Sequence, residues 1–449
     1  MNRNVSIAAA IVLLLGTSAA AADERPNILW IYVDDMSDWV GCYGHSTVAT
    51  PNIDSLANTG IKFERAFMPS PVCSTTRSAL ITGTMQTSYG MHHHRTMIKK
   101  PLPDGMLTIP ELFRKAGYLT FNEAKDDYNF LRERQLMYSP EFKRPKFKSH
   151  LAGNDLTWLR QLRGRKFFGQ IQLKGGKIGG ETGSRYPATS RVDEADVSVP
   201  PYYPDHPVIR NAIARHYEQI VETDEQVGAI IDALREYGLW QNTAVFFFSD
   251  HGSPLPRSKQ FLYEDGTKVP FLICWPADGR ARNEPGRVRT DLVSGIDISA
   301  TSLAIAQIPL PDYIEGIDLL AKPFSPRDHV ISARDRCGIA VDRIRAVRTD
   351  RFRYIRNYKT DRALYQPQYR DGHATFVQLR KMFQAGELNA LQASYFDVAR
   401  RSAEELYDLA GDPNQIENLA EVPAYQEALQ RHRRLLEAWE QQTDDKGQY

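Results

Sequence analysis

The chain has 449 residues, of which 42% are hydrophobic and 25% are charged, and its formal net charge at pH 7 is +1. These values are typical of a soluble globular protein that is long enough for one large domain and a smaller one. Because 56 Lys and Arg are balanced by 55 Asp and Glu, the net charge excludes any general attraction to nucleic acid, and we expect no such partner.

Residues 1–22 have the pattern of a secretory signal peptide. Arg3 precedes an apolar run from Ile7 to Leu15, and small residues follow as a cleavage site. The run is too short to span a bilayer, and no cysteine near the cleavage site could carry a lipid anchor. We therefore expect a periplasmic or secreted protein without a membrane anchor, in which the four cysteines could form disulfides that the sequence does not assign.

The first predicted strand, Asn27–Val33, is apolar without alternation, as expected of a parallel strand buried on both faces. It is followed by Asp34 and Asp35, which would repel each other unless a cation lay between them. A short helix is predicted next, over Pro51–Thr59.

Residues 71–83 place a cysteine at the start of a predicted helix. Ser74 is a suitable N-cap, and Ala79 to Ile81 continue the helix. Cys73 and Arg77 are four residues apart and would share one helix face. Since helix N–H groups attract an anion and a guanidinium adds a planar pair of donors, this pattern predicts an oxyanion site.

Helices and loops are predicted for the middle of the chain. One helix covers Thr108–Ala116, and a longer amphipathic helix begins near Pro207 and stops at Gly238. Between them, residues 130–205 are rich in Lys, Arg, Gly and Pro, and we expect long substrate-recognition loops there. Phe167–Leu173 is a weaker strand candidate within this segment.

Two further apolar segments, Thr243–Ser249 and Val269–Trp275, are predicted to be buried strands. Strands that alternate with helices favour an α/β sandwich, with a large, mostly parallel central sheet flanked by helices. In such a sheet, ligands bind beyond the carboxyl ends of the strands. The residues that follow each strand are therefore the first candidates for a site.

Two of these strand ends carry side chains of the kind that bind metals. Asp34 and Asp35 follow the first strand, and Asp250 and His251 follow the strand that ends at residue 249. Their three carboxylates and one imidazole would form a largely oxygen site for one divalent cation. This set favours Ca²⁺, and the imidazole keeps a softer ion such as zinc as an alternative.

Beyond Pro323 the pattern changes to short strands that precede a final helix, which predicts a smaller C-terminal α+β domain with an antiparallel sheet. We expect the N-terminal α/β catalytic domain to span residues 23–325 and the smaller domain residues 326–449. The predicted elements are strands at Val330–Ala333, Ile344–Arg348 and Phe352–Arg356 and a closing helix from Val422 to Gln441.

The cysteine segment resembles the core motif of the type I sulfatases of the alkaline phosphatase superfamily, C-x-P-x-R-x-x-x-x-T-G. The matching residues are Cys73, Arg77, Thr82 and Gly83. Thr75 stands where that family usually has proline. The aspartate pair and the Asp-His-Gly segment occur in the family's order, and the resemblance covers residues 26–420.

This resemblance implies a specific chemistry. A formylglycine-generating maturation enzyme would convert Cys73 to formylglycine, whose hydrated aldehyde attacks sulfur while Asp250 positions or deprotonates it. An oxygen of the modified Cys73 would then join Asp34, Asp35, Asp250 and His251 as a ligand of the cation. Arg77, Lys125 and Lys259 match the family's cationic contacts to the sulfate and would stabilise its developing charge.

Two positions depart from the family pattern. Asp127 stands where histidine is usual, and Lys177 lies about where another active-site histidine is common. Lys259 or Lys177 would then protonate the leaving group.

The other substrate-binding candidates are charged residues of weaker pattern. Three consecutive histidines cannot all face one ion on a regular element, so we expect residues 92–95, with His94, to form a polar loop that lines the pocket. Asp335 with Arg336, and Asp342 with Arg345, could equally hold a sugar or form an ordinary ion-pair network. The substrate-binding candidates are therefore Lys177, His94, Asp127, Arg336 and Arg345.

Together these features predict an exo-acting hydrolase of a sulfate ester or sulfamate on a sulfated saccharide. Residues 250–263 particularly resemble the heparan N-sulfatases, which makes an N-sulfoglucosamine end of a heparin- or heparan-type glycan the first candidate substrate. The alternatives are an O-sulfatase on another polysaccharide such as an algal glycan, a phosphoesterase of the same superfamily, and an inactive glycan-binding homologue. Cys73 speaks against a phosphoesterase, which would use serine or threonine as its nucleophile, and the oligomeric state stays open.

Overall fold

The computed structural model describes residues 24–142, 155–178, 192–276 and 286–447. The predicted signal peptide lies outside the described residues. Among the described helices, none combines the length and the apolar character that a membrane span requires. All four cysteines are free thiols.

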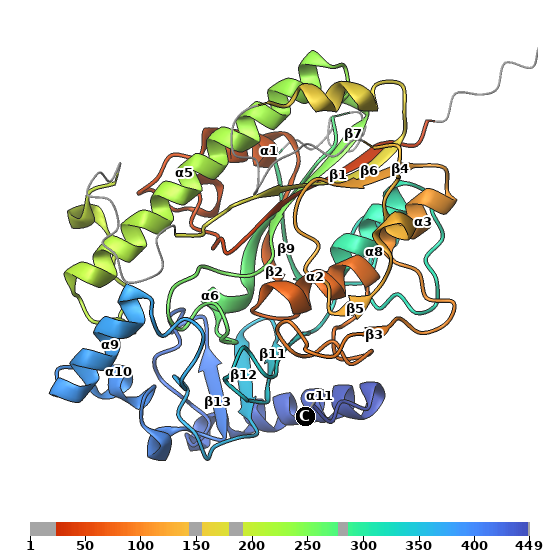
Figure 1. The fold of residues 1–449 in the computed structure, drawn as a ribbon. Helices are drawn as coiled ribbons and strands as arrows, with labels where there is room; N and C mark the ends of the chain where they lie inside the picture. The colour runs from red at the N-terminus through yellow and green to blue at the C-terminus, as the bar shows by residue number, and fades with distance from the viewer. Residues whose placement is uncertain (1–23, 143–154, 179–191, 277–285, 448–449) are drawn as a thin grey trace, which may run out of the picture.

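A seven-stranded mixed sheet forms the centre of the larger part of the molecule (Figure 1). The order across the sheet is β4 (Leu119–Asn122), β6 (Phe167–Leu173), β1 (Asn27–Val33), β7 (Thr243–Ser249), β8 (Lys268–Cys274), β2 (Ile61–Phe67) and β9 (Arg287–Ser294). The first four strands are parallel, β8 is antiparallel to both neighbours, and β9 is parallel to β2. The predicted α/β class is confirmed, and three predicted strands have the observed bounds.

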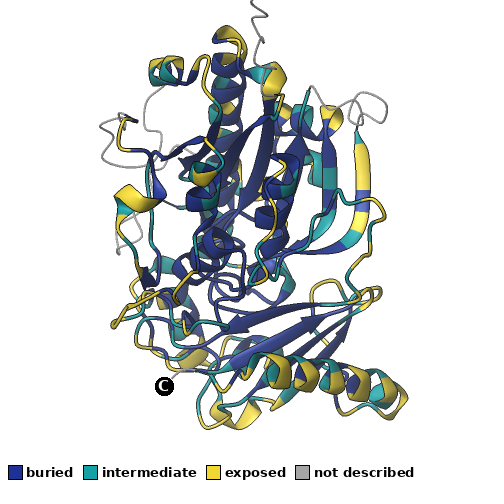
Figure 2. Ribbon diagram, turned by 90° about the vertical axis from the view of Figure 1, so that its right-hand side faces the viewer, coloured by how far each residue is buried: buried dark blue, intermediate teal, exposed yellow. Residues whose placement is uncertain are grey.

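Alternate residues of β1 point into two different hydrophobic clusters, one on each face of the sheet. Leu29 and Ile31 pack with α1 (Pro51–Thr59) and the long helix α5 (Pro207–Glu236). Ile28 and Trp30 pack on the opposite side, where α2 (Cys73–Thr82), α3 (Ile109–Lys115) and α8 (Ile296–Ile305) lie (Figure 1). Burial on both faces, visible for the central strands in Figure 2, stabilises the sheet by roughly 1.5–3 kcal/mol for each large apolar side chain.

Shorter elements connect and extend this sandwich. In the described residues of the larger part, the remaining helices and strands are β3 (Lys100–Pro101), β5 (Phe130–Leu131), α4 (Arg134–Met137) and α6 (Glu264–Thr267). Short 3-10 helices lie at Gly41–Tyr43, Thr157–Leu162, Glu194–Asp196, Trp240–Asn242, Val398–Arg400 and Pro423–Tyr425. The segment 130–205, predicted as loops with one strand, therefore also contains the short strand β5, α4 and two 3-10 helices, while residues 143–154 and 179–191 lie outside the described part.

The predicted N-cap of the cysteine helix was wrong. Helix α2 begins at Cys73 itself, after Val72 in an extended conformation, and it ends before Gly83, whose φ of 70° is suited to glycine. The Ser74 hydroxyl is instead an acceptor for the backbone N–H of Arg95, at 2.7 Å. The Ser74 side chain, which local sequence preference predicts as a helix cap, thus makes a contact with a distant segment instead.

The smaller C-terminal part is built on an antiparallel sheet of four strands (Figure 1). The strands, in order, are β10 (Val330–Arg334), β11 (Ile344–Arg348), β12 (Phe352–Asn357) and β13 (Glu404–Asp408). Helix α11 (Gln426–Thr443) packs on this sheet through Leu429 and Leu436, and α9 (Ala374–Ala385) and α10 (Ala390–Ser394) lie toward α5. The closing helix starts four residues later than predicted because residues 423–425 form a 3-10 turn.

Arg345 belongs to a buried ion-pair network and cannot contact a sugar, which corrects its place among the substrate-binding candidates. Its side chain has no exposed surface, and its guanidinium donates to Asp445 at 2.6 and 3.0 Å and pairs with Asp335 at 3.0 Å. Asp342 pairs with Arg334 and Arg401 rather than with Arg345. Of the two alternatives for this cluster, the structure thus contains the ion-pair network.

Asp445→Ala is expected to destabilise the fold by about 3–5 kcal/mol, because it leaves the buried guanidinium of Arg345 without its bidentate partner. Asp444→Asn, one residue away on an exposed side chain, is the control, because asparagine tolerates the left-handed backbone at this position (φ of 50°), and it should change stability by no more than about 0.5 kcal/mol. Urea denaturation midpoints of the two variants test this, and equal midpoints would contradict it.

Candidate active site

Cys73 is buried at the N-terminus of α2, where three side chains of different charge surround its sulfur. The Sγ lies 3.3 Å from Nε2 of His251, and 3.7 Å from both Oδ1 of Asp35 and Nζ of Lys259. The hydroxyl of Thr75 donates to the Val72 carbonyl at 2.9 Å. Residue 75 is third in the helix, where the N–H has no partner within the helix, so threonine and proline are both compatible with this turn.

The carboxyl ends of β1 and β7 lie side by side and deliver acidic groups to this sulfur. The backbone N–H of Asp35 donates to Oδ1 of Asp250 at 2.9 Å. Nε2 of His251 lies 3.2 Å from Oδ1 of Asp35 and 3.4 Å from Oδ1 of Asp250. One ligand-type atom from each of Asp35, Cys73, Asp250 and His251 falls within 4.8 Å of all the others.

This group fits a divalent cation. All four residues are buried, and Oδ2 of Asp250 makes no hydrogen bond within the described residues. Burial alone would lower the pKa of His251, but Asp250, Cys73 and Asp35 together raise this pKa to about 10. A cluster that holds a proton on a buried imidazole is also one that attracts a cation, and two carboxylates with one imidazole suit Ca²⁺ or a softer ion.

Asp34, the fifth predicted ligand, lies at the same strand end with its oxygens toward basic side chains. Oδ1 pairs with Arg77, and Oδ2 pairs with Lys125 at 3.1 Å and with Lys177. Arg77 is itself fully buried, donates to Gln172 at 2.6 Å and lies over the ring of Tyr32. Asp34 thus gathers three of the predicted cationic residues at one point beside the cysteine helix.

A pair of glycines brings Lys177 to Asp34. The loop after β6 crosses directly over the backbone of the acidic pair. A Cβ on Gly175 would lie 2.0 Å from the Asp34 carbonyl, and one on Gly176 would lie 2.2 Å from the Asp35 carbonyl. Only glycine allows so close an approach, and Lys177 follows at once.

His216 supports this loop from helix α5 and was missed in the sequence. Its Nδ1 bonds to the Gly176 carbonyl at 2.9 Å and its Nε2 to the Ser37 hydroxyl at 2.8 Å. A single histidine on the apolar face of a helix gives no sequence signal beyond its position. Burial lowers the pKa of His216 to about 4, so the ring is neutral at pH 7.

His94 and Asp127 lie at the edge of the cationic group. Nδ1 of His94 is 3.5 Å from Sγ of Cys337, and its Nε2 has no hydrogen bond within the described residues. Burial and the nearby charges of Lys259 and Arg95 lower the pKa of His94 to about 3. Burial would raise the pKa of Asp127, but Lys125 and Arg95 outweigh it and hold this pKa at about 2.

Arg336 supports the loop at the edge of the site. Its Nη1 donates to the Gly338 carbonyl at 2.7 Å and its Nη2 to the Arg95 carbonyl at 3.3 Å. The predicted site residues from the N-terminal part therefore meet around Cys73, Arg336 reaches the same edge from the smaller part, and Arg345 lies apart from them.

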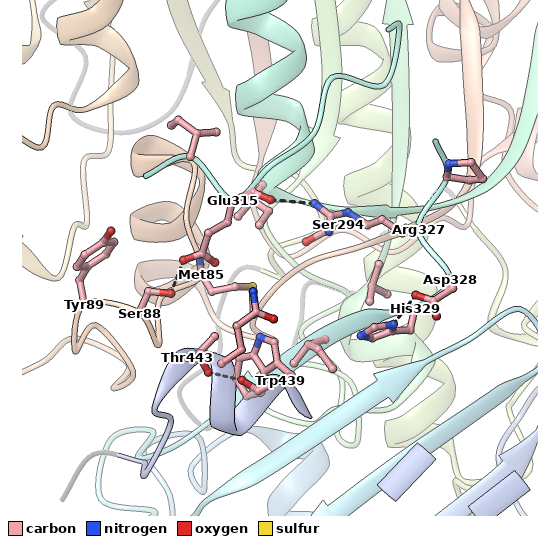
Figure 3. Close-up of a pocket in the computed structure, with 16 residues that line it drawn as sticks. Met85, Ser88, Tyr89, Ser294, Glu315, Arg327, Asp328, His329, Trp439 and Thr443 are labelled. Atoms are coloured by element: carbon pink, nitrogen blue, oxygen red, sulfur yellow. Dashed lines mark hydrogen bonds and ion pairs between the residues drawn. The ribbon is translucent and has the colours of Figure 1, made fainter. Parts of the chain in front are cut away.

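A separate cavity of about 820 Å³ lies between the end of α2 and α11 (Figure 3). Its wall includes Glu315, Arg327, His329 and Trp439, and none of the predicted site residues. The carboxylate of Glu315 already accepts hydrogen bonds from the backbone N–H of Met85 at 3.0 Å and from the Ser88 hydroxyl, and both donors belong to residues that line the cavity. The cavity therefore offers no candidate chemistry comparable to that around Cys73.

Comparisons with known proteins give matches both in sequence and in structure. A family model described as Sulfatase matches residues 26–308, and one described as N-sulphoglucosamine sulphohydrolase, C-terminal, matches residues 257–369. An ulvan-active sulfatase from Formosa agariphila is 32% identical over 93% of this chain and 75% of its own length. Human N-sulphoglucosamine sulphohydrolase is 28% identical over 99% of this chain and 95% of its own. A solved structure in complex with its substrate D-glucosamine-2-N,6-O-disulfate shares the fold, with a TM-score of 0.65, 18% identity and coverage of 94% and 99% of the two chains.

The neutral state of His216 predicts a specific acid sensitivity. Because its native pKa is near 4 and its unfolded pKa is near 6.5, its contribution to stability is complete above pH 6.5 and is lost as the pH falls toward 4. Between pH 7 and pH 5, protonation of this group in the unfolded state should lower the free energy of unfolding of the wild-type protein by about 2 kcal/mol. Urea denaturation at both pH values should show a smaller acid loss for His216→Gln, and parallel losses would contradict the assignment.

Proposed function

The chain belongs to the sulfatase family, and from this premise we propose that it removes sulfate from a saccharide with a formylglycine made from Cys73 and one bound divalent cation. It is a sulfuric ester hydrolase that acts on glycans. The observation that carries the proposal is the convergence of Asp35, Asp250 and His251 on the Cys73 side chain within 4.8 Å. In this proposal, Sγ of Cys73 occupies the place of the formylglycine oxygen.

In this proposal, the cation and the formylglycine supply the reactive groups, and the other residues of the chain hold them in place. When bound, the cation and the formylglycine supply a Lewis acid and an aldehyde-hydrate nucleophile. Asp35, Asp250 and His251 would hold the cation, with Asp34 beside them. Ca²⁺ is the ion we propose, because carboxylate oxygens predominate in this set.

The basic residues would bind the sulfate and stabilise its developing negative charge. Arg77 and Lys125 are held at Asp34, and Nζ of Lys259 lies 2.7 Å from Oδ2 of Asp35, so their charges are in place before substrate arrives. Such preorganised donors need no rearrangement during the reaction. Asp250, which is hydrogen-bonded to the Asp35 backbone, would orient the nucleophile from the opposite side.

The proton for the leaving group would come from a lysine. Burial lowers the pKa of Lys177 and Lys259, but the surrounding aspartates raise both pKa values above normal, so both are protonated at neutral pH. His94, with a pKa of about 3, is neutral and carries no proton of comparable acidity. This supports Lys177 or Lys259 as the proton donor.

Two classes of substrate each have a specific observation in their favour. The match to the N-sulphoglucosamine sulphohydrolase C-terminal model and the nearly full-length human relative favour an N-sulfoglucosamine end that is attacked in an exo mode. The higher identity to the ulvan-active relative favours an O-sulfated sugar of an algal polysaccharide. For location and maturation, we propose a periplasmic or secreted protein, on the pattern of residues 1–22, and a formylglycine-generating enzyme as partner.

Co-expression with a maturation enzyme should convert Cys73, so that the mass of the peptide around it shows loss of sulfur and gain of oxygen. The converted protein should release sulfate from at least one member of a panel of N-, 2-O-, 4-O- and 6-O-sulfated saccharides. Cys73→Ala should lower kcat by roughly a thousandfold or more, whereas Cys42→Ala, outside the site, should retain activity. An unaltered thiol without sulfate release would favour the inactive glycan-binding alternative.

Chelation should abolish sulfate release, and added Ca²⁺ should restore it. Asp250→Asn should weaken Ca²⁺ binding by about a hundredfold or more, because it removes one of the few charged ligands of a hard cation. Asp38→Asn is the control, since its carboxylate pairs with Lys268 at 2.8 Å. Calorimetric titration with Ca²⁺ tests both variants, and recovery by Zn²⁺ alone would contradict the calcium assignment.

A further inference from the structure

We propose that Arg95 binds a second anionic group of the substrate, a carboxylate or a further sulfate, beside the sulfate group that is removed. This inference rests on the proposed function, because it concerns the saccharide bound at the same site. It assigns Arg95 a role that distinguishes substrates, separate from the cleavage of the sulfate itself.

Arg95 is tied by its backbone to the helix that carries the nucleophile. Its N–H donates to the hydroxyl of Ser74, the residue after Cys73, at 2.7 Å. Its side chain is nevertheless 62% exposed, in contrast to Arg77, which is buried against Asp34. Arg95 is thus fixed beside the reaction centre while its charge faces the solvent from which substrate enters.

Asp127 sets the direction of the Arg95 guanidinium. Its carboxylate accepts from Nε at 3.2 Å and from Nη2 at 3.3 Å, which occupies one edge of the planar group. Nη1 forms no hydrogen bond with any residue that the structure describes. Asp127 also lies 3.5 Å from Nζ of Lys125, which reaches Asp34, so one continuous line of charges joins Arg95 to the sulfate-binding residues.

Arg336 acts as a positioning residue for this arrangement. Its Nη2 donates to the Arg95 carbonyl at 3.3 Å, and its own carbonyl accepts from the N–H of His94 at 2.9 Å. Arg95 and Asp127 both have left-handed backbones, with φ of 51° and 49°. Non-glycine residues seldom adopt this conformation, so the contacts of Arg336 and Asp127 together hold Arg95 in an uncommon backbone geometry.

The neighbouring surface has the composition of a saccharide site. Tyr369 is 45% exposed, and its ring packs on His94 with centroids 5.5 Å apart. A Cβ on Gly338, in the loop that Arg336 holds, would lie 3.0 Å from this ring. The exposed part of Tyr369 and the guanidinium of Arg95 together can contact a sugar ring and an anionic substituent.

The test compares matched substrates on one set of variants. The first pair is a sulfated disaccharide with a uronate carboxylate and its carboxyl-reduced form, and the second pair differs by one additional sulfate. Arg95→Gln should lower kcat/KM by about 10- to 100-fold more for the substrate that carries the second anion, mainly through KM, since a hydrogen bond to a charged group contributes about 1.5–3 kcal/mol. Arg95→Lys should lower kcat/KM for this substrate by less, because lysine keeps the positive charge, although it lacks the planar pair of donors of a guanidinium.

Two further variants separate recognition from general effects. Arg336→Gln should also lower kcat/KM more for the substrate that carries the second anion than for its partner, mainly through KM. The reason is that Arg95 would lose its support while the sulfate-binding residues remain. Arg434→Gln, on an exposed position of α11, is the matched control and should leave both substrates of each pair unchanged. Binding of the same saccharides to proteins that also carry Cys73→Ala gives the comparison without turnover.

The outcomes identify the ligand or overturn the proposal. Selective loss in the carboxylate pair supports a uronate, and selective loss in the sulfate pair supports a second sulfate. Equal losses on both substrates of each pair, in turnover and in binding, would overturn the role of Arg95 while sulfate release by wild type would still uphold the proposed function. Absence of sulfate release by the converted wild type would instead contradict the proposed function, and the binding comparison would still decide the role of Arg95.

Discussion

The hydrogen bond from the Asp35 backbone to Oδ1 of Asp250 joins the ends of the two central strands, and the site depends on it. Strands β1 and β7 are in parallel register with Val33 opposite Ser249, so the next residues of both emerge at the same edge. Two acidic groups would separate there unless something held them together. The backbone donor holds Oδ1 of Asp250 beside Asp35, and both residues lie with His251 next to Cys73.

Acidic and basic side chains are paired at this edge. Asp34 pairs with Arg77, Lys125 and Lys177, and Asp35 pairs with Lys259. Nε of Arg77 also lies 3.5 Å from Oδ2 of Asp250, so one guanidinium joins the aspartates that follow the two strands. A buried charge without a partner is expensive, so each of these groups requires the others to be in place.

The smaller C-terminal part reaches the edge of the candidate site through the loop that follows β10. The loop after β10 brings Arg336 and Cys337 against the histidine loop, with His94 and Cys337 paired as an isolated bridge. Behind it, the buried pairing of Arg345 with Asp335 and Asp445 holds the end of the chain on the sheet. The ion pairs of Arg345, which in the sequence could equally have formed a sugar site, thus support the loop that contacts the exposed Arg95.

The sequence by itself determined the features that depend on local pattern. The apolar runs of β1, β6 and β7 predicted their own bounds, the acidic residues after β1 and β7 predicted where side chains would meet, and the cysteine motif predicted a helix near residue 73. Strands β2 and β9 were missed because charged residues interrupt their apolar pattern. Tertiary structure alone decided that Lys177 reaches Asp34, that His216 supports its loop and that Arg345 is buried rather than free to bind. These outcomes depend on contacts between segments far apart in the chain, and no local spacing encodes which of several equivalent charges will find its partner.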